Sequence, residues 1–172
     1  MSDIVLIIQA RMGSSRLPNK MMRKLSSLSL IEWVVKRVKK TKKLKKIIIA
    51  TTKNKKDYTF KKIAKKNNVY FFRGSKNDVL NRYYEAAKYF KGNTIVRVCA
   101  DNPFVDSEQI NLLVNKFKKK QYDYICNHQN KLNSRYADGF GAEIFSMKVL
   151  KKINNKARLK TQRQHVTKYI WD

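Results

Sequence analysis

A cluster of cationic side chains follows the first apolar segment of the chain. Residues 4–8 are all Ile, Val or Leu, and the next twelve residues include Arg11, Arg16 and Lys20 around Gly13. Glycine adopts backbone angles that other residues avoid, so a turn at Gly13 would point successive N–H groups at one anion. Such donors, flanked by cations, suit a polyphosphate. A plain surface loop is the alternative, because neither Gly-x-x-x-x-Gly-Lys-Ser/Thr nor Gly-x-Gly-x-x-Gly occurs here.

The second chemical feature is a carboxylate that follows a later apolar segment. Asp101 comes just after residues 94–99 and shortly before Pro103, in a chain with only 12 acidic residues. Mg²⁺ prefers oxygen ligands and is often bound through one or two carboxylates together with substrate phosphates. Asp101 is therefore the candidate magnesium ligand. The alternative is that its side chain only caps a turn before the proline.

Apolar segments that alternate with helical patterns must position these groups. Short apolar-rich segments predict buried strands at residues 4–8, 47–51, 69–72, 94–99 and 122–126. Strands that alternate with helices imply right-handed crossovers. The sequence therefore predicts an α/β fold with a mainly parallel sheet and helices on both faces.

Helices are predicted between these strands from apolar residues at helical spacing. The first begins at Ser29, which forms a capping-box pattern with Glu32. A later helix begins at Asn77 or Asp78. The other apolar positions with helical spacing are Tyr58, Phe60, Ile63 and Ala64, then Leu80, Tyr83, Tyr84 and Ala87, then Ile110, Leu113, Val114 and Phe117.

The pattern changes after residue 127. Residues 127–138 read as a polar loop and residues 140–146 as a further strand. Residues 149–153 start a helix, and residues 164–171 also have helical spacing.

Ligands of an open parallel sheet bind beyond the carboxyl ends of its strands. This rule places Arg11 after the first strand, residues 73–75 after the third and Asp101 after the fourth along one rim. The sequence therefore predicts a single site that combines the cationic loop with the carboxylate.

The charge of the chain is extreme, because 40 Lys and Arg outnumber 12 Asp and Glu to give a net charge of +28. Such a charge ordinarily raises binding to nucleic acids or anionic membranes. However, 30 of the 40 cations are lysines, whereas base reading and bidentate phosphate capture favour arginine. We therefore interpret most lysines as solvated surface and keep a dedicated RNA surface as the alternative.

Length and cysteine usage favour a single cytoplasmic domain. The 172 residues are enough to bury a substantial core. Cys99 and Cys126 fall in predicted strands without metal-ligand spacing, which is typical of reduced core residues. No apolar run has the length of a membrane span, and the N-terminus lacks a signal-peptide layout.

Residues 8–20, Ile-Gln-Ala-Arg-Met-Gly-Ser-Ser-Arg-Leu-Pro-Asn-Lys, resemble the opening motif of the sugar cytidylyltransferases. Within that family they most resemble the spore-coat-polysaccharide branch, which is related to the acylneuraminate and 3-deoxy-manno-octulosonate enzymes. The resemblance implies that the loop cradles CTP, with Arg11 and Lys20 on the phosphates. It also places four further residues beside the nucleotide: Ala10, Gly13, Ser14 and Arg16.

Two later segments extend the resemblance. Residues 98–103 resemble the family's Asp-x-Pro element, which implies that Asp101 holds a catalytic Mg²⁺. Residues 72–84 resemble a second block, which implies that Arg73 and Ser75 line the nucleotide pocket.

The segments that resemble the family's acceptor side carry more departures. Residues 135–146 resemble a segment near the sugar and the dimer partner, with Ala137 and Gly141 in place of a proline and an aspartate. Residues 163–171 resemble a further block in which Gln162 and Gln164 replace two acids. The residues that the resemblance places at the substrate are Arg135, Asp138, Glu143 and His165.

Two of these substrate assignments have a structural alternative. Glu143 is interpreted either as a second acidic ligand or as a structural carboxylate. His165 either orients the substrate or has only a structural role. Family members usually extend further and add a late acidic motif, so we expect residues 1–172 to be one domain that lacks this C-terminal segment.

The resemblance implies an enzyme that transfers CMP from CTP to a sugar acid and releases pyrophosphate, for cell-surface glycan synthesis. The expected cofactor is Mg²⁺, and the resemblance also implies a homodimer. Lys20, Arg11 and the metal at Asp101 would stabilise charge that develops on the phosphates. An inactive CTP-binding remnant is the second hypothesis and a basic RNA-binding protein the third. Neither the sugar nor the catalytic base is identified by the sequence.

Overall fold

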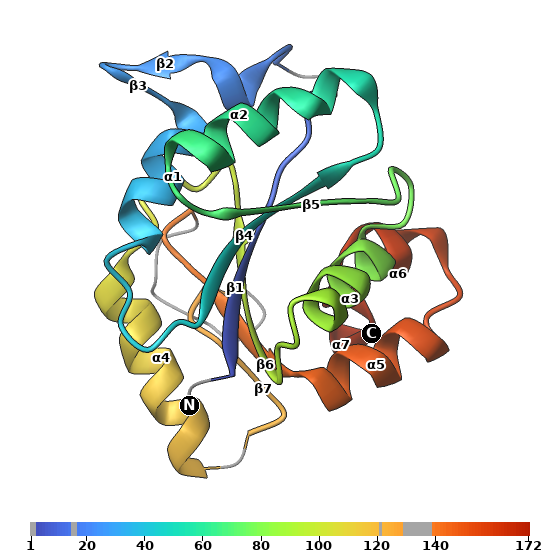
Figure 1. The fold of residues 1–172 in the computed structure, drawn as a ribbon. Coiled ribbons are helices and arrows are strands. Elements are labelled where there is room, and N and C mark those ends of the chain that lie inside the picture. Colours follow the sequence, from blue (N-terminus) through green and yellow to red (C-terminus); the bar gives the residue numbers. More distant parts are fainter. Residues whose placement is uncertain (1–2, 15–16, 121, 129–138) are drawn as a thin grey trace.

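A six-stranded sheet forms the centre of the molecule (Figure 1). The computed structural model describes residues 3–14, 17–120, 122–128 and 139–172. The strand order across the sheet is β5-β4-β1-β6-β8-β7. The strands of this sheet are β1 (Ile4–Gln9), β4 (Lys46–Thr52), β5 (Tyr70–Gly74), β6 (Thr94–Cys99), β7 (Tyr124–Cys126) and β8 (Glu143–Ser146).

The parallel sheet expected from the sequence is confirmed, with one antiparallel insertion. Strand β1 pairs in parallel with β4 and with β6, and β4 pairs in parallel with β5. Strand β8 runs antiparallel between β6 and β7, so β7 points the same way as β1 without pairing with β6. The carboxyl ends of β1, β4, β5 and β6 therefore lie along one edge.

Helices cover both faces of the sheet, as predicted (Figure 1). One buried cluster joins the sheet to α1, α2 and α4 through residues such as Val34, Phe60 and Leu113. The other joins it to α3 and α5 through Leu80 and Leu150. The helices are α1 (Leu30–Val38), α2 (Thr59–Lys66), α3 (Val79–Tyr89), α4 (Ser107–Lys120), α5 (Met147–Lys156), α6 (Lys160–Gln164) and α7 (Lys168–Trp171).

The continuous apolar run of β1 reflects its burial on two sides. Ile4, Leu6 and Ile8 belong to the first cluster, whereas Val5 and Ile7 belong to the second. Successive side chains of a strand point to opposite faces, so a strand covered on both faces is apolar throughout.

Several predicted boundaries differ from the structure. The single helix expected over residues 164–171 is wrong, because His165 is extended and separates α6 from α7. The strand expected at residues 140–146 begins only at Glu143, and that expected at 122–126 begins at Tyr124. The sequence also gave no sign of four short elements: η1 (Lys20–Met22), β2 (Lys24–Leu25), β3 (Leu28–Ser29) and η2 (Lys55–Tyr58).

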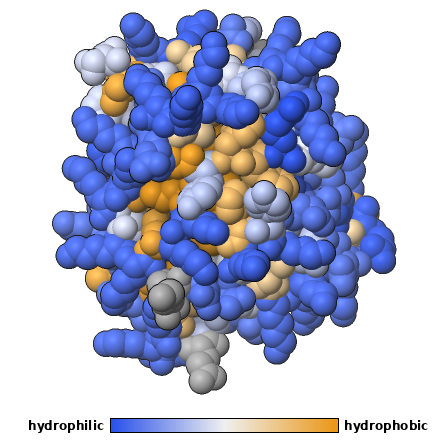
Figure 2. Space-filling view, in the orientation of Figure 1, coloured by the Kyte–Doolittle hydropathy of each residue, from blue (hydrophilic) through white to orange (hydrophobic). Residues whose placement is uncertain are grey.

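Strand β5 forms one end of the sheet and is flanked by exposed aromatic rings. Tyr70 of β5 is 48% exposed and packs against Phe90 with ring centroids 5.1 Å apart. Lys46 Nζ lies 5.3 Å from the centroids of both rings. Figure 2 shows this apolar area over β5 and the adjoining part of β4, enclosed by hydrophilic side chains.

In the described part of the chain, no helix combines the length and apolarity needed to cross a bilayer.

The predicted capping residues of α1 are confirmed. Glu32 Oε2 accepts hydrogen bonds from Ser29 N at 3.0 Å and from Ser29 Oγ at 2.6 Å. Its other oxygen accepts from Lys66 Nζ of α2 at 2.7 Å. Burial acts to raise the pKa of Glu32, but the hydrogen bonds from Lys66 and Ser29 outweigh it and lower the pKa to about 2. The carboxylate thus fixes the start of α1 and joins it to α2.

We expect Glu32→Gln to lower the free energy of unfolding by about 1–2 kcal/mol at pH 7, because it removes a charged acceptor of several hydrogen bonds. The folded-state pKa lies below the ordinary value of 4.5. The native carboxylate therefore stabilises fully above pH 4.5, and its advantage over the variant shrinks as the pH falls toward 2. Urea unfolding at pH 7 and pH 3 measures both effects. Glu108→Gln, at an exposed carboxylate, is the control, and equal losses for the two variants would contradict the capping role.

Candidate active site

Three adjoining cavities lie at the carboxyl edge of the sheet. Their volumes are about 340, 330 and 430 Å³. The first and second share Arg11 and Lys76 as lining residues. The second and third share Arg97, Cys99, Asp101 and His165. Because neighbouring cavities share lining residues, they adjoin one another, and we call the three together the trough.

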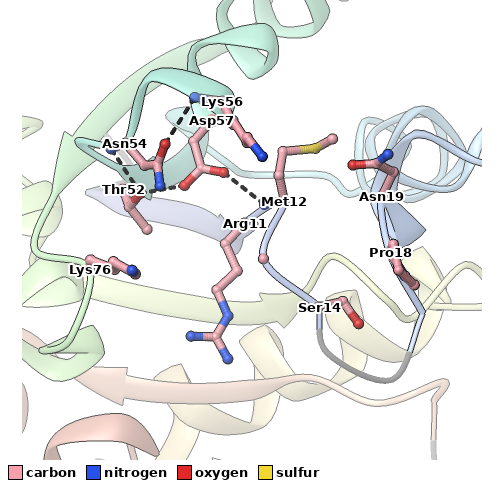
Figure 3. Close-up of a pocket in the computed structure, with 11 residues that line it drawn as sticks. Arg11, Met12, Ser14, Pro18, Asn19, Thr52, Asn54, Lys56, Asp57 and Lys76 are labelled. Carbon is pink, nitrogen blue, oxygen red and sulfur yellow. Dashed lines mark hydrogen bonds between the residues drawn. The ribbon is translucent and has the colours of Figure 1, made fainter.

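The first cavity lies between the loop after β1 and the end of β4 (Figure 3). Arg11 extends into it, with Lys76 to one side and Ser14 to the other. The loop is held by Asp57, whose Oδ1 accepts from Met12 N at 2.7 Å and whose Oδ2 accepts from Thr52 Oγ1. Asp57 is only 3% exposed, so this link is shielded from water. The start of the cationic loop is therefore fixed to the neighbouring strand.

The structure brings two of the predicted catalytic residues into contact. Lys20 Nζ donates to Asp101 Oδ2 at 2.8 Å, and the pair spans from the start of η1 to the turn after β6. Arg11 and Asp101 both line the second cavity. The predicted meeting of the loop and the carboxylate at one rim is thus observed. Asp101 also lines the third cavity, so its carboxylate is placed at the rim as the sequence led us to expect.

The loop itself differs in detail from the turn predicted at Gly13. Gly13 is not among the glycines with a positive φ, and a Cβ there would meet nothing within 4 Å. Among the described residues of the loop, the left-handed one is Asn19, with φ 55°, just before η1. The expectation that glycine shapes this turn is therefore wrong. Ser14 lines the first cavity as predicted and accepts a hydrogen bond from Leu17 N at 3.2 Å.

Two of the predicted nucleotide residues face the protein rather than the trough. Arg73 Nε donates to Thr52 O at 3.3 Å, and Ser75 Oγ accepts from Asp78 N at 3.1 Å. Their neighbours Lys76 and Asn77 line the second cavity instead. Ala10 is buried at the end of β1 and donates from its backbone to β4. Arg16, Arg135 and Asp138 lie outside the described residues.

The third cavity contains a buried ion pair. Arg97 Nη1 donates to Glu143 Oε1 at 2.6 Å, and Glu143 is 1% exposed. The same oxygen lies 3.5 Å from His128 Nε2, and Arg97 Nη2 donates to Cys99 Sγ at 3.4 Å. Burial acts to lower the pKa of Arg97, but Cys99 and Glu143 outweigh it and hold that pKa above its usual value. This pairing supports the structural interpretation of Glu143, as the partner that keeps a cation in the cavity wall.

His165 occupies the junction between the second and third cavities. It follows α6 with extended backbone angles, and its N–H donates to Thr161 O at 3.0 Å. The exposed imidazole lines both cavities, which fits the prediction that it meets a substrate.

Sequence reasoning missed three side chains of the trough or of its support. The sequence signal for Arg97 was a charged residue inside an otherwise apolar strand. The signal for Lys76 was its position within residues 72–84, which resemble a block of the family. Asp57 gave a weaker signal, as one of few acidic residues shortly after a strand.

The fold and the trough match a known family. A family model described as cytidylyltransferase matches residues 5–171. The chain belongs to the cytidylyltransferase family. Members of this family are enzymes. Membership of the family supports transfer of CMP from CTP to a sugar-type acceptor as the reaction.

Curated relatives of this cytidylyltransferase include proteins with sugar-related names. It is 40% identical over 169 residues to an uncharacterised protein of Methanocaldococcus jannaschii, covering 98% of this chain and 67% of that protein. It is 34% identical over 177 residues to the spore coat polysaccharide biosynthesis protein SpsF of Bacillus subtilis, covering 99% and 70%. It is 32% identical over 127 residues to the 3-deoxy-manno-octulosonate cytidylyltransferase of Rickettsia bellii, covering 72% and 51%.

A solved cytidylyltransferase from Leptospira borgpetersenii superposes on this cytidylyltransferase with a TM-score of 0.91 and 32% identity. The match covers 99% of this chain and 71% of that one. The nucleotidyltransferase fold expected from the sequence is therefore confirmed.

We expect Asp57→Asn to weaken CTP binding about tenfold, because the carboxylate that orders the cationic loop is lost. Stability should fall as well, by about 1–3 kcal/mol, since Met12 N and Thr52 Oγ1 lose a charged acceptor. Isothermal calorimetry and urea unfolding measure the two losses. Asp123→Asn, at an exposed residue preceding β7, is the control. Native CTP affinity in a destabilised Asp57 variant would show that the link does not serve the loop.

Proposed function

We propose that the protein transfers CMP from CTP to a sugar acid, with release of pyrophosphate, in cell-surface glycan synthesis. The observation that carries the proposal is the Lys20–Asp101 pair beside the second and third cavities, both of which Asp101 lines. The pair lies where the cationic loop meets the end of β6. A trough of this kind suits a reaction that joins two substrates.

The nucleotide is assigned to the first and second cavities because their walls are cationic. Arg11 and Lys76 line both of them, and Lys20 lies at the rim through its contact with Asp101. A triphosphate carries several negative charges, which this set of cations would neutralise. Asp57 would keep the loop in place as the phosphates bind, since it already holds Met12 N.

The acceptor is assigned to the third cavity. Arg97 and His165 line it as hydrogen-bond donors, and its volume of about 430 Å³ suits a sugar-sized molecule. The name of one relative specifies a sugar acid, 3-deoxy-manno-octulosonate, and that of another specifies polysaccharide biosynthesis. These names support a sugar acid as the acceptor and glycan synthesis as the purpose.

Asp101 fits the expected magnesium ion in donor type and in position. Within the described residues, no group of three or more metal-binding side chains is found. Mg²⁺ often uses one or two carboxylates and completes its shell with water and substrate phosphates, so Asp101 alone is compatible with it. Mg²⁺ bound there would supply charge stabilisation on the phosphates.

The proposed reaction is attack of an acceptor hydroxyl on the α-phosphorus, with pyrophosphate as the leaving group. Negative charge builds on the phosphoryl oxygens during this transfer. The Lys20 ammonium, which Asp101 already holds, and the Arg11 guanidinium would stabilise this charge. Such electrostatic stabilisation is usually the largest single contribution to catalysis.

We expect Lys20→Ala to lower turnover by about 10²–10³, because one preorganised cation is lost. Asp101→Asn should reduce turnover at least as much. Pyrophosphate release from CTP with 3-deoxy-manno-octulosonate and related sugar acids is the measurement. Lys62→Ala, at an exposed lysine on α2, controls for loss of charge alone. If the native chain binds CTP but releases no pyrophosphate with any acceptor, the inactive-remnant hypothesis holds instead.

CTP should bind more tightly with Mg²⁺ than without it, because Asp101 would hold a cation that offsets the negative charge of the phosphates. Calorimetric titrations with and without Mg²⁺ measure this difference, and Asp101→Asn should abolish it. If the native protein binds CTP equally well in both conditions, Asp101 is not a metal ligand.

A further inference from the structure

The side chain of Arg163 links two segments that lie far apart in the sequence. Its Nε donates to Asp78 Oδ2 at 2.9 Å, and its Nη2 contacts the same oxygen. It also reaches α5, where Nη1 donates to Asn154 O at 2.6 Å and Nη2 to Asn154 Oδ1 at 3.0 Å. The Arg163 and Asp78 side chains are 21% and 30% exposed, so solvent screens their attraction only in part.

Asp78 controls the loop that forms one wall of the second cavity. Its Oδ1 accepts from Asn81 N at 2.8 Å and caps α3, and its own N–H donates to Ser75 Oγ at 3.1 Å. Lys76 and Asn77, between these two anchors, line the cavity. Buried Arg82 supports the same loop through Nη1, which donates to Ser75 O at 2.5 Å. The position of this wall therefore depends on Asp78.

Arg163 directly precedes another part of the wall of the second cavity. It lies in α6 directly before Gln164 and His165, which both line the second cavity. His165 lines the third cavity as well. The ion pair thus joins the loop at residues 75–78 to the segment that reaches the acceptor end.

We infer that Arg163 is a positioning residue that couples the nucleotide loop at residues 75–78 to His165 through Asp78. The inference rests on the proposed function and deepens it, because it names how nucleotide binding is transmitted to the acceptor end. Arginine suits this role because its planar fork meets Asp78 and Asn154 together. A lysine at this position would keep the charge but lose the fork.

The two histidines of the chain, His128 and His165, give a direct readout by NMR. A His128→Gln variant assigns their imidazole signals. In the native protein, saturating CTP should shift the His165 signals. Arg163→Lys should reduce this shift at least about twofold at saturating CTP and weaken CTP binding about three- to tenfold. Asp78→Asn should do the same, because asparagine still caps α3 but lacks the charge. The double variant should lose no more than the larger single loss.

Two controls separate coupling from simple support of α6. Arg158→Lys, at an exposed residue shortly before α6, should leave the His165 response unchanged. The response of His128, which lies beside Glu143 rather than on α6, should not depend on Arg163.

A full His165 response in Arg163→Lys at saturating CTP would overturn the inference and reduce the pair to structural support, even if the melting temperature falls. A native protein that binds CTP without any His165 response would also overturn it, while the proposed nucleotide site would stand. A native protein that does not bind CTP would overturn the proposed function and this inference with it.

Discussion

The parallel pairing of β1 with both of its neighbours determines where the cationic loop and Asp101 lie. Gln9 is level with Ala50 of β4 on one side and with Cys99 of β6 on the other. Strands β1 and β6 therefore end level with each other, and β4 ends two residues beyond Ala50, so the chain leaves all three strands at the same edge. The contacts of Met12 with Asp57 and of Lys20 with Asp101 both follow from this register.

The antiparallel strand β8 supplies the carboxylate that pairs with Arg97 of β6. In the pairing of β6 with β8, Arg97 lies opposite Glu143, so a partly buried cation meets a buried anion across adjacent strands. A buried charge without a partner is strongly destabilising, and this pairing keeps a guanidinium in the trough. Arg82 shows the contrasting case, because burial lowers its pKa.

The architecture could be predicted from the sequence because its signals are local and periodic. The apolar run of β1, the capping pair at Ser29 and Glu32, and the alternation of strands with helices are each readable in short windows. The insertion of β8 between β6 and β7 was not predictable, because it depends on pairing between distant segments. The break at His165 was missed because apolar spacing continues across it.

For the site, the sequence placed Arg11 and Asp101 at one rim, and the family resemblance added Lys20, but neither could say which side chains are in contact. The contact of Lys20 with Asp101 joins residues 81 positions apart, and the ion pair of Arg163 with Asp78 joins residues 85 apart. No local pattern encodes such distances. The roles that the family resemblance implies for Arg73 and Ser75 stay predictions, since both side chains form hydrogen bonds with backbone groups of neighbouring segments.

The edge strand β5 gives the lysine-rich surface a role that is separate from substrate binding. An end strand with exposed aromatic rings is a template on which another chain can pair, and lysine is a common safeguard against such pairing. With a net charge of +28, two copies that approach edge to edge repel each other before their backbones meet. The protection is electrostatic, so it weakens as salt shortens the screening length. Resistance to association between copies is thus encoded in this sequence, in addition to its fold and its chemistry.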